Sequence, residues 1–333
     1  LAAGRPVRVV LVTGSSGFLG QHVVRLLQED QPTVKEIRLM DIRPFENNLG
    51  HRTDKPMRET VGSVCDVETL MEAFIGVDCV IHCASLIDVR FFKDVKAMEA
   101  VNVQGKQCFF FLLFLSSNCS LSAWATSPLR KPLGVPPNVP LTFLFALPGA
   151  GQTQLRTVVL RQLPLYGEQE KINFTQFLRV SKVTRGTFLR IGSSRLQTTY
   201  VGNAAAAHLH AMHRLARDAD VSGQAFTVTD DTPTDGIQFM LPFARSRGLS
   251  VSRFAVPYSV ALAISVLVML VLTLLRPLYN PTFQVASPSD VRYVYRAPFF
   301  DGSRARTVLG FQPRFSVEDA LRMSMPYYQA VQL

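Results

Sequence analysis

Acidic side chains are missing from residues 100 to 167, although Asp and Glu make up 25 of the 333 residues. The same region is rich in proline, since six of the chain's 20 prolines lie between Pro128 and Pro148. Proline removes a backbone donor and clashes with the preceding turn, which excludes a regular helix there. This segment therefore differs in composition from the sequence on either side of it.

Cysteine is scarce, and none of the five cysteines forms a C-x-x-C pair. The absence of such a pair excludes a zinc-finger type of site, so no metal is expected. The odd number of cysteines argues against a disulfide framework, and a reducing compartment is the simpler interpretation. The formal net charge of +10 is not accompanied by a nucleic-acid motif or an alternating aromatic-basic pattern. We therefore expect no nucleic acid among the partners.

Apolar residues make up 47% of the chain and charged residues 18%, a composition typical of a folded protein with a large core. Residues 7 to 12 form a continuous apolar run, as expected for a buried parallel strand. Glycines follow at three-residue spacing, and a helical apolar pattern then begins at Phe18 (Gly14, Gly17 and Gly20). Strand, glycine turn and helix in this order predict a phosphate-binding turn.

A second predicted strand, residues 36 to 41, ends in Asp41. A carboxylate at this place accepts hydrogen bonds from a ribose and repels a 2′-phosphate, which favours NAD over NADP, although the nearby Arg43 softens this preference. A third strand is predicted to end at Asp66. A fourth, residues 77 to 84, carries small residues where a cofactor would lie, and its His82 is expected to be a packed residue.

These segments together resemble the 3β-hydroxysteroid dehydrogenase/isomerase family of the extended short-chain dehydrogenase/reductase superfamily. The resemblance rests on "VTGSSGFLG", "CDV" at 65 to 67, "IHCASLIDV" at 81 to 89 and "VNVQG" at 101 to 105. It resumes with "LRTVVLRQLPLYGE" from residue 155, "TYVGNAAAAHLHA" from 199, "FTVTDDTPTD" from 226 and "LGFQPRFSVEDAL" from 309.

The resemblance implies an NAD site and a substrate pocket for a steroid or sterol. The residues implied for the cofactor site are Gly14, Gly17, Phe18, Gly20, Asp41, Asp66, Val67, Ala84 and Asn102. Tyr166 and the predicted strand from Tyr200 to Asn203 would border the substrate, while the alternative for Tyr200 is simple strand core.

The catalytic part of the family pattern is broken. The family places a strand ending in serine and then a Tyr-x-x-x-Lys helix, in which the lysine lowers the tyrosine pKa for acid or base work. None of the eight tyrosines has a lysine four residues later. The run "CFFFLLFL" was a candidate for the missing fifth strand, with Ser116 or Ser117 in place of the catalytic serine. We favour the hypothesis that residues 107 to 153 replace the proper exon sequence.

Residues 256 to 275 contain no charge and are flanked by Arg253 and Arg276. Twenty residues in a helix cover about 30 Å, the thickness of the hydrocarbon core, and this predicts a membrane helix. The histidines at 208, 210 and 213 lie on a predicted helix without a carboxylate or cysteine beside them, so we expect a helix surface there. "DDTPTD" is expected to form a turn and a helix cap.

The predicted architecture is an α/β fold, a Rossmann-type doubly wound parallel sheet with a smaller C-terminal substrate lobe and one membrane-associated helix. Its expected parts are residues 1–106 and 155–250 for the sheet and the start of the lobe, 107–154 for an atypical insert, 254–277 for the membrane helix and 278–333 for the rest of the lobe. The expected location is the endoplasmic reticulum membrane, with the mitochondrial membrane as the alternative.

Three functions remain open at this point. The first is a membrane-bound, NAD-dependent dehydrogenase of 3β-hydroxysteroids, with or without Δ5–Δ4 isomerisation, that is impaired in this chain. The second is a catalytically silent protein that binds NAD or a sterol. The third is a product that folds poorly because its sheet lacks a strand. Membrane lipid is an expected partner in the first case, and a homodimer is compatible with all three.

Overall fold

The computed structural model describes most of the chain. The described residues are 6–88, 90, 92–105, 141–146, 155–172, 174–183, 186–191, 195–278, 286–296 and 299–332. The predicted run "CFFFLLFL" with Ser116 and Ser117 lies outside them, as do Cys108 and Cys119.

A seven-stranded sheet forms the centre of the molecule, in the order β10-β6-β5-β4-β1-β2-β3. Its strands are β1 (Val9–Thr13), β2 (Glu36–Asp41), β3 (Met57–Val61), β4 (Cys79–His82), β5 (Leu141–Ala146), β6 (Arg156–Gln162) and β10 (Gln224–Val228). The buried residues of β1 and β4 explain why their sequences are continuous apolar runs. The predicted doubly wound sheet is confirmed.

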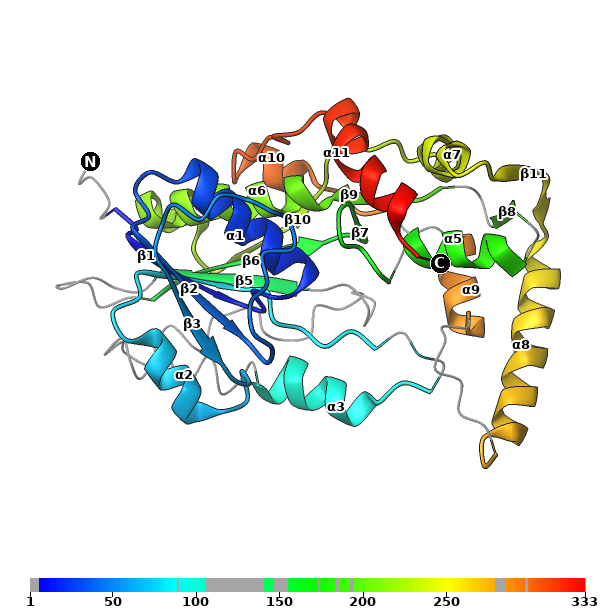
Figure 1. Ribbon diagram of the computed structural model, residues 1–333, viewed down its shortest axis with the longest axis horizontal. Coiled ribbons are helices and arrows are strands. Elements are labelled where there is room, and N and C mark those ends of the chain that lie inside the picture. Colours follow the sequence, from blue (N-terminus) through cyan, green and yellow to red (C-terminus); the bar gives the residue numbers. More distant parts are fainter. Residues whose placement is uncertain are drawn as a thin grey trace.

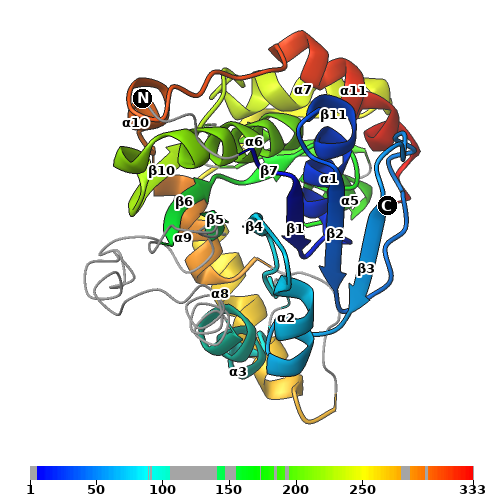
Figure 2. The ribbon, with the colours of Figure 1, turned by 90° about the vertical axis from the view of Figure 1, so that its left-hand side faces the viewer.

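One strand of this sheet runs against the others. β5 pairs antiparallel with β4, where His82 lies opposite Phe143, and antiparallel with β6, where Leu141 lies opposite Arg161. Figure 2 shows β5 between these two neighbours. The hypothesis that the sheet lacks a strand at this position is therefore wrong for this structure, because residues 141–146, and not "CFFFLLFL", close the gap.

Helices cover both faces of the sheet (Figure 1). α1 (Phe18–Asp30) and α6 (Val201–Arg217) lie side by side on one face and bury apolar side chains against β1, β2, β6 and β10. The other face carries α2 (Val67–Phe74) and, further along, α3 (Val95–Glu99), which continues into a π-helix over Ala100–Gly105. These two apolar layers fix the carboxyl ends of β1, β2 and β4 at one edge of the sheet.

A smaller lobe follows β6. It contains two short parallel pairs, β7 (Leu165–Tyr166) with β9 (Thr199–Tyr200) and β8 (Thr187–Ile191) with β11 (Ser250–Val256). Its helices are α5 (Phe174–Val183), α7 (Gly236–Ser246) and α11 (Val317–Ala330), packed around a separate apolar cluster. Asp235 caps α7 by accepting hydrogen bonds from the N–H groups of Ile237 and Gln238, so the predicted cap in "DDTPTD" is confirmed.

The chain from β11 to the C-terminus contains the apolar helix α8 (Tyr258–Leu275) and then α9 (Pro288–Arg296) and α10 (Ser303–Thr307). α8 stands at one end of the molecule with α9 beside it (Figure 1). Only Ser265 and Leu272 of α8 are buried. α8 is long and apolar enough to cross a membrane, and it is the one such helix among the described residues.

Candidate functional site

The glycine turn after β1 is built from contacts that exclude side chains. Gly14 has a φ of +72°, and its N–H donates to the carbonyl oxygen of Met40 at 2.8 Å. A Cβ at Gly14 would lie 2.6 Å from the backbone nitrogen of Ala84, in the segment that follows β4. Only glycine satisfies both the left-handed conformation and this close approach. The turn thereby joins the carboxyl ends of β1, β2 and β4.

The start of α1 leaves donors available for an anion. Gly17 is the N-cap residue and supplies no side-chain cap, and the first turn contains no acidic residue. Gly20 lies so close to the turn that a Cβ there would meet the carbonyl oxygen of Gly14 at 2.0 Å. A helix N-terminus without a side-chain cap and without an acidic residue in its first turn suits a pyrophosphate, so the residues present fit the predicted dinucleotide.

Asp41 ends β2 beside this turn. One carboxylate oxygen accepts a hydrogen bond from the N–H of Ser16 at 3.0 Å, and the other accepts from the N–H of Arg43 at 3.3 Å. The hydroxyl of Ser16 donates to the carbonyl oxygens of Arg43 and Pro44 at 3.2 Å each. These bonds fix a negative group at the sheet edge, where it can accept from ribose hydroxyls and repel a phosphate. This role of Asp41 stays a prediction.

Asp66 lies elsewhere than the sequence predicted. β3 ends at Val61, and Asp66 is the N-cap of α2, where it accepts from the N–H of Glu68 at 3.2 Å. The hydroxyl of Thr69 also donates to its carboxylate and lowers the pKa of Asp66. The prediction that Asp66 ends a strand is wrong, because Gly62 turns the chain and Asp66 starts the next helix. Val67, the first residue of α2, is 42% exposed.

Asn102 holds the segment that follows β4. Its amide oxygen accepts from the N–H of Leu86 at 2.9 Å and from the hydroxyl of Ser85 at 3.1 Å, and its amide nitrogen donates to the carbonyl oxygen of Leu86 at 2.8 Å. Since Ala84 touches Gly14, this clamp also fixes one wall of the glycine turn. Asn102 is therefore a positioning residue in the geometry of this edge.

His82 and His208 are packed residues, whereas His210 and His213 are half-buried on α6, as expected for a partly exposed helix surface. His82 is buried, and its Nδ1 lies 2.7 Å from the hydroxyl of Thr13 on the neighbouring strand. His208 is also buried and bonds to the carbonyl oxygen of Ala204, so the prediction of a helix surface is wrong at this position. Burial lowers the pKa of His208 to about 4. Among the described residues, no three His, Cys, Asp or Glu side chains lie close enough to hold a metal ion.

The predicted substrate residues lie in the interior of the smaller lobe. Tyr166 is 1% exposed and its hydroxyl lies 3.1 Å from that of Thr232. Tyr200 is fully buried and its hydroxyl donates to the carboxylate of Glu168 at 2.9 Å. Burial raises the pKa of both tyrosines. The strand predicted over 200 to 203 is wrong beyond Tyr200, because Val201 begins α6.

Asn203 therefore lies in the first turn of α6. Its amide nitrogen donates to the carboxylate of Asp230 and to the carbonyl oxygen of Phe315, both at 3.0 Å, and its amide oxygen accepts from the N–H of Phe315 at 2.8 Å. This arrangement joins α6 to the segment before α11. The contact of Tyr166, Tyr200 and Asn203 with a substrate stays a prediction.

Glu168 is a residue of this site that the sequence did not predict. Its carboxylate is 15% exposed, accepts from Tyr200 and lies 3.5 Å from the guanidinium of Arg25. The backbone carbonyl of Glu168 also lies 3.0 Å from Nε2 of His22. Together these contacts tie α1 to the smaller lobe. The available signal was the "YGE" motif, which places an acid two residues after a packed tyrosine.

Comparison with known proteins decides the family. The model of the 3-beta hydroxysteroid dehydrogenase/isomerase family matches residues 11–111 and 148–257. The chain belongs to this family. It is 28% identical to human 3 beta-hydroxysteroid dehydrogenase type 7 over 97% of this chain and 96% of the relative, and 27% identical to the mouse protein of that name over 98% and 97%.

The fold is shared with a wider group. A double mutant of DesIV, a dTDP-glucose 4,6-dehydratase from Streptomyces venezuelae, has NAD and DAU bound in its solved structure. It has a TM-score of 0.57 with this family member at 17% identity, covering 96% of this chain and 97% of the other. NAD is the cofactor of this family, as the sequence predicted, and NAD is bound in several of the structures with this fold.

Proposed function

We propose that this chain binds NAD at the edge formed by β1, β2 and β4 and that its family activity, oxidation of a 3β-hydroxysteroid, is impaired. When bound, NAD accepts a hydride from the substrate carbon. Gly14, Gly17 and Gly20 would leave room for the pyrophosphate, and Asp41 would accept from the adenosine ribose. Asn102 would hold the segment carrying Ala84 against the cofactor.

The proposal of impaired catalysis rests mainly on the direction of β5. The strand that follows the Asn102 helix in the family pattern brings its serine to the edge where β1, β2 and β4 end. Here β5 is antiparallel, so Leu141 lies near that edge and Ala146 lies at the opposite one. A residue directly after β5 would be about 20 Å from the cofactor edge, at about 3.3 Å per strand residue.

The missing tyrosine and lysine support the same conclusion. No Tyr-x-x-x-Lys occurs in the 333 residues, so no helix of this chain presents that pair one turn apart. Without it, the chain lacks the family's general base for the hydroxyl proton of a substrate. The family model leaves residues 112–147 unmatched, and this stretch falls within the compositionally distinct segment.

We propose that the substrate class is a steroid or sterol and that the chain is bound to a membrane, with the endoplasmic reticulum favoured over the mitochondrion. Family membership supports the substrate class. The exposed apolar helix α8 supports the membrane, because a helix of this composition in a water-soluble core would be buried. Isomerisation would follow oxidation only if the dehydrogenase site were complete.

A silent NAD-binding or sterol-binding protein is the second candidate. It is favoured by the combination of an intact glycine turn and a continuous sheet, since both support cofactor binding without supplying a base. The two candidates differ in turnover, because an impaired enzyme retains a low steroid-dependent rate and a silent binder has none.

The test uses the full chain in detergent micelles. NADH binding is followed by fluorescence, and NADH formation is followed in the presence of NAD and a panel of 3β-hydroxysteroids, with the human type 7 relative as the positive control. We expect binding together with a rate at least about a thousandfold below that of the relative, the scale of loss on removal of a general base. A comparable rate would refute the proposal, as would the absence of NADH binding by a folded chain.

A tryptic digest of the native protein shows whether the distinct segment is present in the cell. The peptide from residue 107 to residue 130 reports the chain as written. Its detection, without any peptide that carries a Tyr-x-x-x-Lys helix, is expected if the impaired chain is the expressed product. Detection of only the second kind of peptide would assign the activity to a different form of this protein.

A further inference from the structure

Five exposed apolar residues of α8 form a stripe along one face of the helix. Counting along the helix, Val260, Ile264, Leu267, Val271 and Leu274 alternate at spacings of four and three, so they share one face. We call these residues the outer stripe. Their side chains are between 44% and 80% exposed, and Leu278, just beyond the helix, is 87% exposed.

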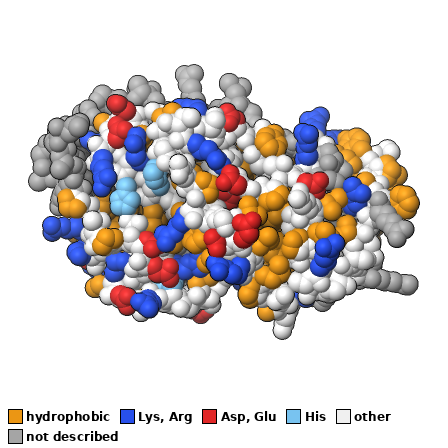
Figure 3. Space-filling model, turned by 90° about the horizontal axis from the view of Figure 1, so that it is seen from above, with side chains coloured by type: hydrophobic (Ala, Val, Ile, Leu, Met, Phe, Trp, Pro, Cys, Tyr) orange, Lys and Arg blue, Asp and Glu red, His pale blue; other side chains and the backbone are white. Residues whose placement is uncertain are grey.

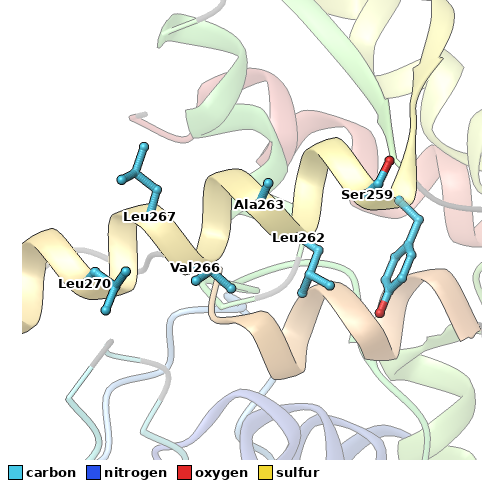
Figure 4. Close-up of a pocket in the computed structure, with 7 residues that line it drawn as sticks. Ser259, Leu262, Ala263, Val266, Leu267 and Leu270 are labelled. Carbon is cyan, nitrogen blue, oxygen red and sulfur yellow. The ribbon is translucent and has the colours of Figure 1, made fainter.

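The opposite face of α8 lies against the protein. Ser265 and Leu272 are buried, and Tyr258 packs edge to face on Tyr295 of α9, with ring centres 5.3 Å apart. In Figure 4, Leu262 points toward α9 and Leu267 points away from it. The far end of the helix is also attached, because the guanidinium of Arg276 lies 4.8 Å from the centre of the Phe92 ring. α8 is therefore held at both ends.

The chain before α8 and the chain after it form one packed body. Arg247, which precedes α8, donates to the carbonyl oxygens of Tyr328 and Gln329 at the end of α11. The hydroxyl of Tyr328 accepts from the N–H of Gly167 at 3.0 Å. Further contacts of the same kind join Gln197 to Phe300, Asn203 to Phe315 and His210 to Leu309.

This packing is incompatible with a single crossing of a bilayer. A spanning helix would separate these partners by about 30 Å of hydrocarbon. A second crossing would have to return the chain between Leu275 and Pro288, and the 12 residues between them are fewer than the roughly 17 that a spanning helix needs. An extended return would leave backbone groups unpaired in lipid.

We propose that α8 lies in one leaflet, with its outer stripe in the acyl chains, and that both flanks of the helix stay on the same side of the membrane. This deepens the proposed membrane-bound function and rests on it. The partner is a lipid surface carrying anionic headgroups, because exposed Arg276 follows the stripe and Arg292 and Arg296 are exposed on α9 beside it. On the face seen in Figure 3, acidic and basic side chains are interspersed over the sheet-bearing half, and more of the hydrophobic side chains lie on the half that carries the smaller lobe.

The topology is tested by translating the full chain in the presence of sealed endoplasmic reticulum microsomes. Two versions carry a short epitope at the N-terminus or at the C-terminus, and thermolysin is added with and without detergent. After flotation, we expect both epitopes on membrane-bound chains to be digested without detergent. Protection of exactly one epitope would overturn the proposal, since the helix would then span the bilayer.

The lipid contact is tested by flotation with vesicles of phosphatidylcholine containing about one fifth phosphatidylserine. The double variant Leu267→Asp/Leu274→Asp is expected to lose about tenfold or more of its vesicle binding, because two carboxylates would enter the acyl region. Ile75→Asp is the control, since Ile75 is 71% exposed directly after α2, which lies at the other end of the molecule from α8 in Figure 1, and it should bind as the unchanged chain does.

Failure of this inference is distinguishable from failure of the proposed cofactor function. Unchanged vesicle binding by the double variant would overturn the lipid contact. If the unchanged chain does not float with the membranes, both this inference and the membrane-bound function fail. NADH binding in detergent is measured on the same preparations, and its retention by the double variant shows that the altered chain is folded.

Discussion

Asn102 and Leu86 form a reciprocal pair in which one side-chain amide satisfies both backbone groups of the other residue, with hydrogen bonds of 2.8 and 2.9 Å. Leu86 is two residues from Ala84, whose backbone touches the glycine turn. The pair therefore connects a π-helical turn to the wall of the predicted cofactor site. We therefore expect Asn102 to influence how tightly NAD binds by fixing this wall.

Replacing Asn102 with Ala should weaken NADH binding about five- to tenfold, because the segment after β4 loses three hydrogen bonds and with them its fixed position. The dissociation constant is measured by NADH fluorescence. Val103→Ala is the matched control, since Val103 is in the same turn and 47% exposed. Unchanged affinity of a folded Asn102→Ala chain would show that the clamp does not position the site.

Replacing Asp41 with Ser should shift cofactor preference toward NADP. The substitution removes a charge that would repel a 2′-phosphate and leaves a hydroxyl that can still bond to the N–H of Ser16. We expect the ratio of NADPH to NADH affinity to rise about tenfold, or about 1.4 kcal/mol. Asp54→Ser, in the exposed loop before β3, should leave the ratio unchanged. An equal ratio of NADPH to NADH affinity in both variants would show that Asp41 does not lie at the ribose.

Gly20→Ala should destabilise the fold. The new methyl group would meet the carbonyl oxygen of Gly14 at 2.0 Å, and two backbones would have to separate to relieve the clash. We expect the free energy of unfolding to fall by about 2 kcal/mol or more, with loss of NADH binding. Gly223→Ala is the control, because a Cβ there meets nothing within 4 Å and only its φ of +76° is strained. Equal denaturation midpoints for Gly20→Ala and Gly223→Ala would contradict the expected destabilisation by the clash at Gly20.

Stability should decline as the pH falls from 6.5 toward 4. Burial lowers the pKa of both His22 and His208 from 6.5 to about 4. The unfolded chain therefore takes up a proton at each histidine in this range, whereas the folded chain does not. We expect a loss of about 2 kcal/mol for each histidine between pH 6.5 and pH 5. Urea midpoints at several pH values measure the slope. His208→Gln should reduce this slope, because it removes one of the two titrating groups.

The sequence predicted the parts of the fold that local patterns control. The apolar run of β1, the glycine spacing and the bounds of β2 all follow from short-range rules, and the structure has β2 at the predicted residues. The direction of β5 could not be predicted in this way, because its six residues fit either direction. Pairing with β4 and β6 decides the direction, and pairing is not visible in a local pattern.

The candidate site was predictable in location but not in its contacts. Motif spacing placed Asp41 near the glycine turn, and the family resemblance placed Asn102 there. Neither could reveal that Asp66 caps a helix, or that Tyr200 is fully buried and donates its hydroxyl hydrogen bond to Glu168. These contacts depend on where turns end and on which segments distant in sequence pack together, and local motifs do not show either.

The reversed β5 has a consequence for how a defect in this chain would be detected. The sheet is continuous from β3 to β10 whichever way that strand runs. A measurement of secondary structure such as circular dichroism would therefore not detect the proposed impairment. Detecting it takes a measurement of product formation, because an abundance screen would count this chain and a working relative as equal.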